Sequence, residues 1–210
     1  MSVRLARPAV ALAAIAAVSL AGVAQAAPAK KAPPVCNQVV DEKDDAAIIT
    51  SQPGMDVVSA DIASDAKQLS AVIRLAAKPN TANPEAVGAS RYYFEFLAPG
   101  SENPQYLQAS IAFGTGTATF RSGEIVPSAN GSTFTNDAVN DGVTGKIEGE
   151  VITINAKLSA LTRIKPAVGT KIKGLTVETF SLAGVLLVPV DDALTSKPYV
   201  AGAATCVKLG

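Results

Sequence analysis

Apolar and polar residues alternate along most of the chain after residue 34, with the period of two that is typical of half-buried β-strands. In residues 68–75 the odd-numbered positions are apolar. In residues 91–96 the even-numbered positions are aromatic, which leaves Tyr93 and Glu95 on the opposite face. Residues 104–114 repeat the alternation and are the expected hairpin partner of 91–97 across the turn at 99–104. These segments predict paired strands with one apolar face.

The spacing of turns extends this prediction to the rest of the domain. Turn residues at Pro53-Gly54, 78–88 and 99–104 separate short β-rich segments. A helix over 62–77 would accommodate the apolar residues there, but turn signals on both sides favour a strand. Residues 126–142 are expected to form a polar, turn-rich excursion. The pattern predicts an all-β fold, a single antiparallel β-sandwich (jelly-roll-like) of about 8-10 strands.

The first residues have the character of a secretory signal peptide. Arg4 and Arg7 precede an uninterrupted apolar run, and Ala24-Gln25-Ala26 supplies a small-x-small cleavage site. An uncleaved membrane anchor is the alternative, because the run is near the minimum length that spans a bilayer. We expect residues 1–26 to be a signal peptide, 27–34 a flexible tether and 35–210 the β-sandwich domain. The mature protein would then be secreted and extracellular, without stable membrane insertion.

The chain has two cysteines, Cys36 at the start of the predicted domain and Cys206 near its end. In an oxidising compartment, two cysteines are most simply joined to each other. Such a disulfide would tie the first strand to the last segment and mark the limits of one domain. Two free thiols, or two intermolecular links, are the alternatives.

Composition narrows the chemistry that the domain can carry. The chain has no histidine, so a Ser-His-Asp triad, a Cys-His dyad and histidine-based metal sites are unavailable. It also has no tryptophan, so a sugar-stacking platform would depend on four tyrosines. Of the 18 basic residues, Arg4 and Arg7 leave with the signal, so 16 basic residues face 18 acidic ones in the mature chain. A chain with this charge is not expected to present the positively charged surface that binds nucleic acid. We expect a monomer that binds no nucleic acid and is not an enzyme.

Acidic residues gather at 41–45 and again at Asp191-Asp192. If the disulfide brings the terminal segments together, these groups could converge with Asp56. Hard oxygen ligands from several loops are what Ca²⁺ prefers. The candidate site for a structural calcium comprises Asp41, Asp44, Asp45, Asp56 and Asp191. A solvated acidic turn is the alternative, because the spacing is not that of an EF-hand.

Two further groups of residues are candidates for function. Tyr93 and Tyr106 fall on the face opposite to the predicted core, where we expect them to be exposed and to face a ligand. A carboxylate pair for hydrolysis would need two carboxyls about 5–10 Å apart in a cleft. The strand-like segments offer four candidates for such a pair: Glu95, Glu148, Glu150 and Glu178.

Six stretches, taken in the order in which they occur, carry a resemblance to a known group of domains: VVDEKDDA, DVVSADIASDAKQLSAVIRL, RYYFEFLA, VTGKIEGEVITINAKLSAL, VGTKIKGLTVETF and DDALTSKPYVAG. Through them the chain resembles the β-sandwich accessory domains of bacterial secreted proteins, which are DOMON-like or carbohydrate-binding-module-like. The resemblance spans most of residues 36–206 and implies the fold. Because such domains are diverse in ligand, it does not name one.

Together these patterns favour a secreted, non-catalytic binding module. Its partner would be cell-envelope material, an extracellular protein or a glycan such as a polysaccharide. A carrier of a small hydrophobic ligand is the first alternative, since the apolar residues are rich in Ala, Val and Ile and poor in bulky aromatics. A carboxylate-based hydrolase is the second.

Overall fold

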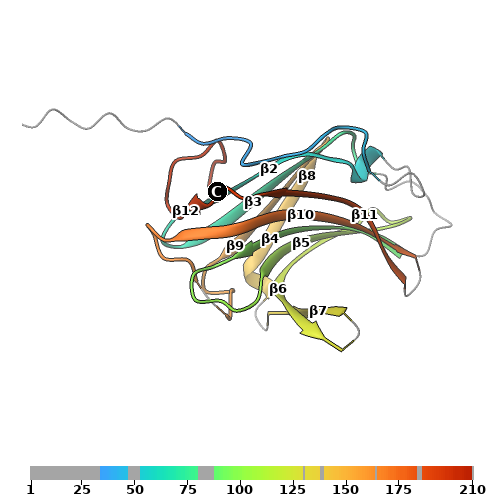
Figure 1. Cartoon of the computed structure of the whole chain (residues 1–210). Helices are drawn as coiled ribbons and strands as arrows, with labels where there is room; N and C mark the ends of the chain where they lie inside the picture. Colours follow the sequence, from blue (N-terminus) through green and yellow to red (C-terminus); the bar gives the residue numbers. More distant parts are fainter. Residues whose placement is uncertain are drawn as a thin grey trace, which may run out of the picture. The chain divides into compact units, whose positions relative to one another are not determined.

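The computed structural model consists of two antiparallel β-sheets that share one core, which confirms the all-β sandwich (Figure 1). The structure describes residues 34–46, 53–79, 88–129, 131–137, 140–163, 165–183 and 186–209. The predicted signal peptide, and the predicted tether up to residue 33, lie outside these residues. Among the described residues, none belongs to a helix with the length and apolar character needed to cross a membrane.

Twelve strands are present in the described residues, ten of them with six residues or more. The first sheet has the order β1 (Val39–Val40), β2 (Val57–Ser64), β3 (Gln68–Leu75), β9 (Val151–Lys157) and β8 (Val143–Glu148). The second has the order β11 (Leu186–Thr195), β10 (Lys171–Ala183), β4 (Gly88–Leu97), β5 (Gln105–Ala112), β6 (Ala118–Ser128) and β7 (Gly131–Asn136), and β12 (Tyr199–Val200) pairs with β10. The short 3₁₀ helices η2 (Pro53–Met55) and η3 (Asn140–Gly142) lie directly before β2 and β8.

The core is built from the faces that the alternation predicts. The odd-numbered apolar residues of β3 and the even-numbered aromatic residues of β4 are all buried in it. Because β3 belongs to the first sheet and β4 to the second, their side chains join the two layers. Burial of each large apolar side chain stabilises the fold by roughly 1.5–3 kcal/mol. The strand interpretation of residues 62–77 is confirmed, since β2 and β3 cover most of this segment.

Strict alternation fails near the start of β2. The pairing of β2 with β3 shifts register between Val57 and Ser59, which is the signature of a β-bulge. As a result Val57 lies in the core with Ala60 and Ile62, whereas alternation alone places it on the face of Ser59. A bulge adds one residue to the strand, so the side chains before it point to the opposite face of the sheet from the one that alternation predicts.

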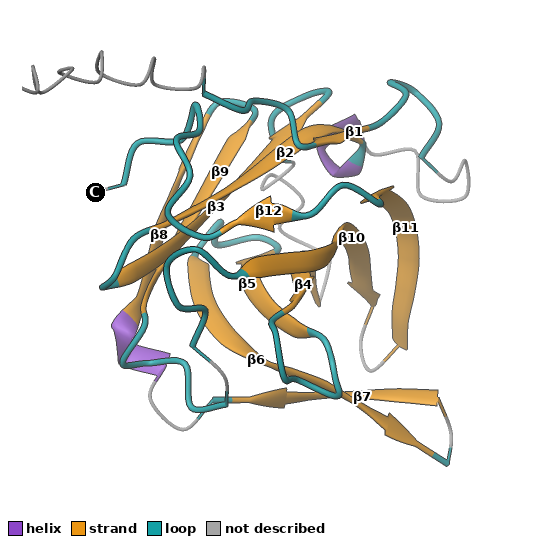
Figure 2. Ribbon diagram, turned by 60° about the vertical axis from the view of Figure 1, so that its left-hand side comes forward, coloured by secondary structure: helices purple, strands orange, loops and turns teal. Residues whose placement is uncertain are grey.

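Residues 126–142 do not form the expected irregular excursion. Residues 131–136 form β7, which pairs with the end of β6 in a hairpin. The Asn-Gly dipeptide at 130–131, flanked by alternating residues, is a hairpin signal that identifies this strand from the sequence. Figure 2 shows the second sheet strongly curved, with the β6–β7 hairpin towards one end and β11 at the other.

The disulfide between Cys36 and Cys206 is present, with the two Cα atoms 5.2 Å apart. It joins positions separated by 170 residues and so closes almost the whole domain. Next to it, the Val35 N–H donates to the Ala204 carbonyl at 3.0 Å, and Val35 and Thr205 form a parallel bridge. The terminal segments therefore lie side by side, as predicted.

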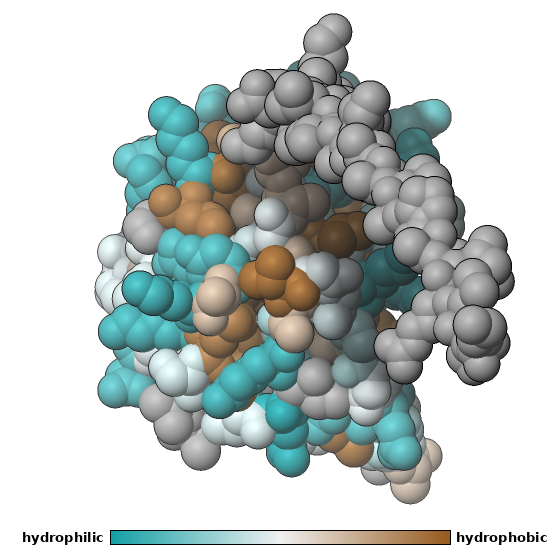
Figure 3. Space-filling model, turned by 90° about the vertical axis from the view of Figure 1, so that its left-hand side faces the viewer, coloured by the Kyte–Doolittle hydropathy of each residue, from teal (hydrophilic) through white to brown (hydrophobic). Residues whose placement is uncertain are grey.

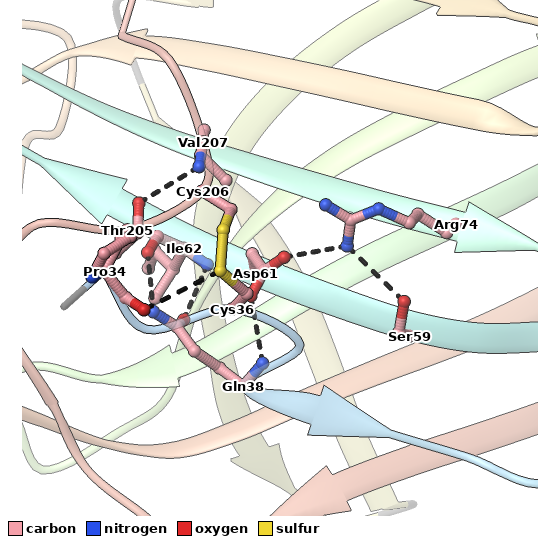
Figure 4. A network of polar contacts seen from close by, with 10 residues as sticks. All are labelled: Pro34, Cys36, Gln38, Ser59, Asp61, Ile62, Arg74, Thr205, Cys206 and Val207. Atoms are coloured by element: carbon pink, nitrogen blue, oxygen red, sulfur yellow. Dashed lines mark hydrogen bonds and ion pairs between the residues drawn. A yellow bond between two sulfur atoms is a disulfide. The ribbon is translucent and has the colours of Figure 1, made fainter.

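A buried carboxylate anchors the segment after the disulfide to the first sheet (Figure 4). The Asp61 side chain, fully buried in β2, accepts a hydrogen bond from the Gln38 N–H at 2.9 Å and pairs with the Arg74 guanidinium at 2.8 Å. The Gln38 amide in turn bonds to the backbone of Ile62 in both directions. Each of these contacts satisfies a polar or charged group whose burial without a partner would be costly.

Candidate functional site

Four of the five predicted calcium ligands come together at one edge of the sandwich. Asp41 follows β1, Asp45 lies in the next loop, Asp56 immediately precedes β2, and Asp191 belongs to β11. Carboxylate oxygens of Asp41, Asp45 and Asp191 lie within 4.8 Å of one another. The cluster thus joins the loop after β1 to β11, which is far away in the sequence, and a merely local acidic turn would not do this.

Backbone N–H groups orient these carboxylates. The Val57 N–H donates to Asp191 Oδ2 at 2.7 Å, and the Asp44 N–H donates to Asp56 Oδ2 at 2.7 Å. Asp44 contributes this N–H while its own side chain is exposed, and its φ of 72° is left-handed. Asp41, Asp45 and Asp191 form the centre of the cluster, and Asp56 lies near enough for its charge to act on Asp191. These four residues are hereafter the aspartate cluster, and Asp44 belongs to its frame.

Burial and repulsion from neighbouring charges disfavour the charged forms of Asp41, Asp56 and Asp191. Burial, followed by the charge of Asp191, raises the pKa of Asp41 to about 6. Burial is also the main cause that raises the pKa of Asp56 and of Asp191, with the charge of Asp45 adding to both. A nearby cation would reverse this effect, because an opposite charge favours the ionised form.

The prediction that Tyr93 and Tyr106 are exposed is wrong. Both lie on the outer face of the second sheet, as the alternation requires, yet Tyr93 is 0% exposed and Tyr106 1% exposed. Phe134 of β7 covers them, with ring centroids 4.6 Å from Tyr93 and 5.7 Å from Tyr106. The rings are packed against other aromatic side chains, so they do not form an open stacking platform.

The curvature of the sheet explains this burial. β7 and β10 are separated by three strands, so in a flat sheet their axes would be about 19 Å apart. The rings of Phe134 in β7 and Phe180 in β10 are nevertheless only 6.2 Å apart. Phe180 also meets the edge of Tyr93 at 5.5 Å. The outer face of the second sheet is therefore concave, and its centre is an aromatic cluster.

A glycine permits the close approach of β7. A Cβ atom at Gly123 in β6 would lie 1.7 Å from the Thr135 carbonyl oxygen and 2.6 Å from the Tyr106 hydroxyl. With no side chain there, the Tyr106 hydroxyl reaches the Thr135 carbonyl at 3.1 Å and Asn136 Oδ1 at 3.0 Å. The absence of a side chain at Gly123 thus permits both the close approach of β7 to β6 and the hydrogen bonds of the Tyr106 hydroxyl.

The concave face holds a pocket of about 230 Å³, hereafter the outer-face pocket. It is lined by Arg91, Tyr93, Tyr106, Gln108, Ser110, Thr119, Arg121, Phe134 and Asn136. These residues include two arginines and no acid. Among the described residues, neither Arg91 nor Arg121 forms an ion pair. Arg91 Nε is buried without a hydrogen-bond partner in the described part of the chain, and the buried Tyr93 hydroxyl lies close to the side chains of Arg91 and Gln108.

Glu95 and Glu178, two of the four candidate carboxyls, lie beside this pocket. Burial, then the charge of Glu178 and a hydrogen bond with it, raises the pKa of Glu95 to about 8, so Glu95 is mostly protonated at neutral pH. Burial and the charge of Asp192 raise the pKa of Glu178 as well. Glu148 and Glu150 are exposed at the β8–β9 hairpin and do not join them.

A second pocket, of about 370 Å³, lies at the disulfide end. Its lining includes four exposed apolar side chains: Val35, Val40, Leu194 and Val200. Figure 3 views this end and shows apolar side chains among hydrophilic ones at the surface. The sequence pattern does not indicate this pocket, because its exposed apolar residues come from two stretches, 35–40 and 194–200, that are far apart in the sequence.

No family model, curated protein or solved structure matches this chain. The resemblance to DOMON-like and carbohydrate-binding-module-like domains therefore stays a prediction, and function has to be inferred from the geometry of the sites.

Proposed function

We propose that this chain is an exported, non-catalytic binding module that recognises an acidic polysaccharide through the outer-face pocket. The observation that carries the proposal is the pair Arg91 and Arg121, which line one pocket without an acidic partner among the described residues. Arg91 Nε is buried and has no hydrogen-bond partner in the described part of the chain. Buried polar groups in native proteins are normally paired, so a ligand that pairs them would be favoured.

The chemistry of the lining selects the ligand class. A guanidinium group binds carboxylate and sulfate groups through parallel hydrogen bonds, which makes arginine the usual residue for such anions. Gln108, Ser110 and Asn136 add neutral hydrogen-bonding groups suited to sugar hydroxyls. Glu95 does not oppose an anion at neutral pH, because burial keeps it mostly protonated. A pocket of about 230 Å³ suits one charged sugar residue or branch of a longer chain.

The mode of recognition differs from the one that the sequence predicted. Since the faces of Tyr93 and Tyr106 are covered by Phe134, sugar stacking on them is blocked. Their role in the proposal is to hold the floor of the pocket and to offer the Tyr93 hydroxyl. Affinity would come from charge and hydrogen bonds, and it would fall as salt is added.

Two observations support export. The sequence predicts a cleavable signal peptide, and the Cys36–Cys206 disulfide is a bond that persists in oxidising compartments. The partner would accordingly be a component of the cell envelope or of the surrounding medium.

The carrier and hydrolase alternatives make different predictions. A carrier would use the apolar lining of the disulfide-end pocket and would co-purify with a hydrophobic molecule detectable by mass spectrometry after denaturation. A hydrolase would use the Glu95–Glu178 pair and would lose turnover in a Glu95→Gln variant that still folds. The binding module should give neither result.

The deciding experiment compares acidic with neutral polysaccharides. Purified protein is incubated with insoluble polyuronate, sulfated and neutral glucan beads, and the pelleted protein is quantified. We expect saturable sedimentation with the acidic materials only, weakened at least tenfold in Arg121→Gln, whose side chain is exposed and not needed for packing. Lys146→Gln, an exposed cation on β8 of the other sheet, is the matched control and should bind normally. Equal binding to neutral glucan, or normal binding by Arg121→Gln, would overturn the proposal.

A further inference from the structure

We infer that the aspartate cluster (Asp41, Asp45, Asp56 and Asp191) is a Ca²⁺ site that fastens the loop after β1 to the start of β2 and to β11. It is built from different strands than the outer-face pocket and does not depend on the proposed function. The inference depends on three observations: the segments that carry the aspartates converge, two buried carboxylate oxygens have no partner in the described part of the chain, and all the ligand atoms are oxygens.

Convergence comes from the strand topology. The Asp41 N–H donates to the Val58 carbonyl in β2 at 3.1 Å, which places Asp41 beside the first residues of that strand. Val57, next to Asp56, donates to Asp191 of β11. The three ligand-bearing segments are therefore held against each other by backbone hydrogen bonds even before a cation is considered. A site assembled in this way binds a cation with little loss of conformational entropy.

Two buried oxygens in the cluster lack partners. Asp56 is 2% exposed, and its Oδ1 has no hydrogen-bond partner in the described part of the chain, whereas its Oδ2 accepts from Asp44 N–H. Asp41 shows the same division: Oδ1 accepts from the Glu42 N–H at 3.0 Å, and Oδ2 is buried and unpartnered. A buried carboxylate oxygen without a partner is costly, so these oxygens point to a missing ligand.

In the described part of the chain, the charge of the cluster is not compensated by an ion pair. None of the ion pairs within 4.0 Å among the described residues involves Asp41, Asp45, Asp56 or Asp191. Buried charges in proteins are paired or coordinate metals. Protonation is one solution for such carboxyls, and a bound cation, which favours their ionised form, is the other.

The ligand set selects Ca²⁺. All the donors are carboxylate oxygens, which suit Ca²⁺ or Mg²⁺ and disfavour metals that prefer nitrogen or sulfur. The oxygens of Asp41, Asp45 and Asp191 lie within 4.8 Å of one another, close enough for all three to contact one ion. The loop ligands also give the adaptable geometry that Ca²⁺ accepts.

The test uses CaCl₂ as the probe on the purified, disulfide-intact protein after treatment with a chelating resin. Isothermal titration calorimetry should show one Ca²⁺ per chain, with weaker binding of MgCl₂, and thermal unfolding should move to higher temperature with Ca²⁺ and back with EDTA. Asp45→Asn, at an exposed position, should fold normally and bind Ca²⁺ at least tenfold more weakly. Asp141→Asn, an exposed aspartate in η3, is the matched control and should bind as the wild type does.

Three results would overturn the inference. The first is the absence of both heat and thermal shift at about 10 mM Ca²⁺, which is above the weakest dissociation constants of extracellular calcium modules. The second is equal affinity for Mg²⁺, which would remove the choice of Ca²⁺. The third is normal Ca²⁺ binding by Asp45→Asn. Loss of polysaccharide binding in Arg121→Gln leaves all three measurements unaffected, so the two proposals fail or succeed separately.

Discussion

Replacement of Glu95 by Gln should flatten the dependence of stability on pH. Glu95 is 8% exposed, and burial together with Glu178 raises its pKa from 4.5 to about 8. Because the folded-state pKa lies above the unfolded-state value, the folded protein binds more protons between these pH values. Its free energy of unfolding is therefore highest at low pH and falls as the pH rises through 8.

The size of the effect follows from the two pKa values. For a single carboxyl with pKa 4.5 when unfolded and about 8 when folded, the free energy of unfolding falls by about 4 kcal/mol between about pH 5 and about pH 9. Gln has the shape of a protonated Glu and does not titrate. The variant should thus match the wild type near pH 5 and exceed its stability by about 4 kcal/mol near pH 9.

Urea unfolding at several pH values, with the disulfide intact and EDTA present throughout, measures this difference. EDTA keeps the aspartate cluster free of metal, and its carboxyls then contribute equally to both proteins. Glu148→Gln is the control: this carboxyl is 68% exposed in its pair with Lys146, so its curve should run parallel to that of the wild type. If the Glu95→Gln curve is also parallel to the wild-type curve, the assignment of a protonated, buried Glu95 is refuted.

Three further substitutions test the frame around the two sites. Removal of the disulfide by Cys36→Ser with Cys206→Ser should lower the free energy of unfolding by about 3–5 kcal/mol in urea, since it frees a loop of 170 residues; a loss below about 1 kcal/mol would contradict this. Gly123→Ala places a methyl group against the Thr135 carbonyl, and it should cost about 1–3 kcal/mol and weaken polysaccharide binding; an unchanged melting temperature would show that β7 does not need this close approach. Asp61→Ala removes the carboxylate partner of the partly exposed Arg74 guanidinium, which keeps its 3.4 Å hydrogen bond to Ser59, and leaves the Gln38 N–H unpaired. Thermal and urea unfolding should report a loss of about 3 kcal/mol; wild-type stability would mean that this ion pair contributes nothing.

The sequence alone was sufficient for the fold class and for the covalent frame. Period-two alternation is a local property of an extended chain, so it assigns Tyr92 and Leu69 to the core and Tyr93 to the opposite face without knowledge of the partner strands. Two cysteines in one chain allow a single intramolecular pairing, and the structure has it. The acidic residues around Asp41 could also be identified, since they are dense in the sequence.

The sequence could not predict which side chains on the outer face are exposed, or which distant residues lie close together. Tyr93 lies on the predicted face and is nevertheless buried, because Phe134 of β7 reaches it across two intervening strands. The bulge near Val57 altered the face of one residue that alternation had assigned. Each difference arises from sheet curvature or register, which are properties of many strands together.

The same reasoning separates the two candidate sites. The sequence determined which residue types were available and which of them face away from the core. Only the tertiary structure placed Asp191 beside Asp41, paired Glu95 with Glu178, and put Arg91, Arg121 and the Tyr93 hydroxyl around one pocket. Alternation depends on neighbours one or two residues away, whereas these contacts depend on the order, register and curvature of strands that are distant in the sequence, and no local pattern encodes those.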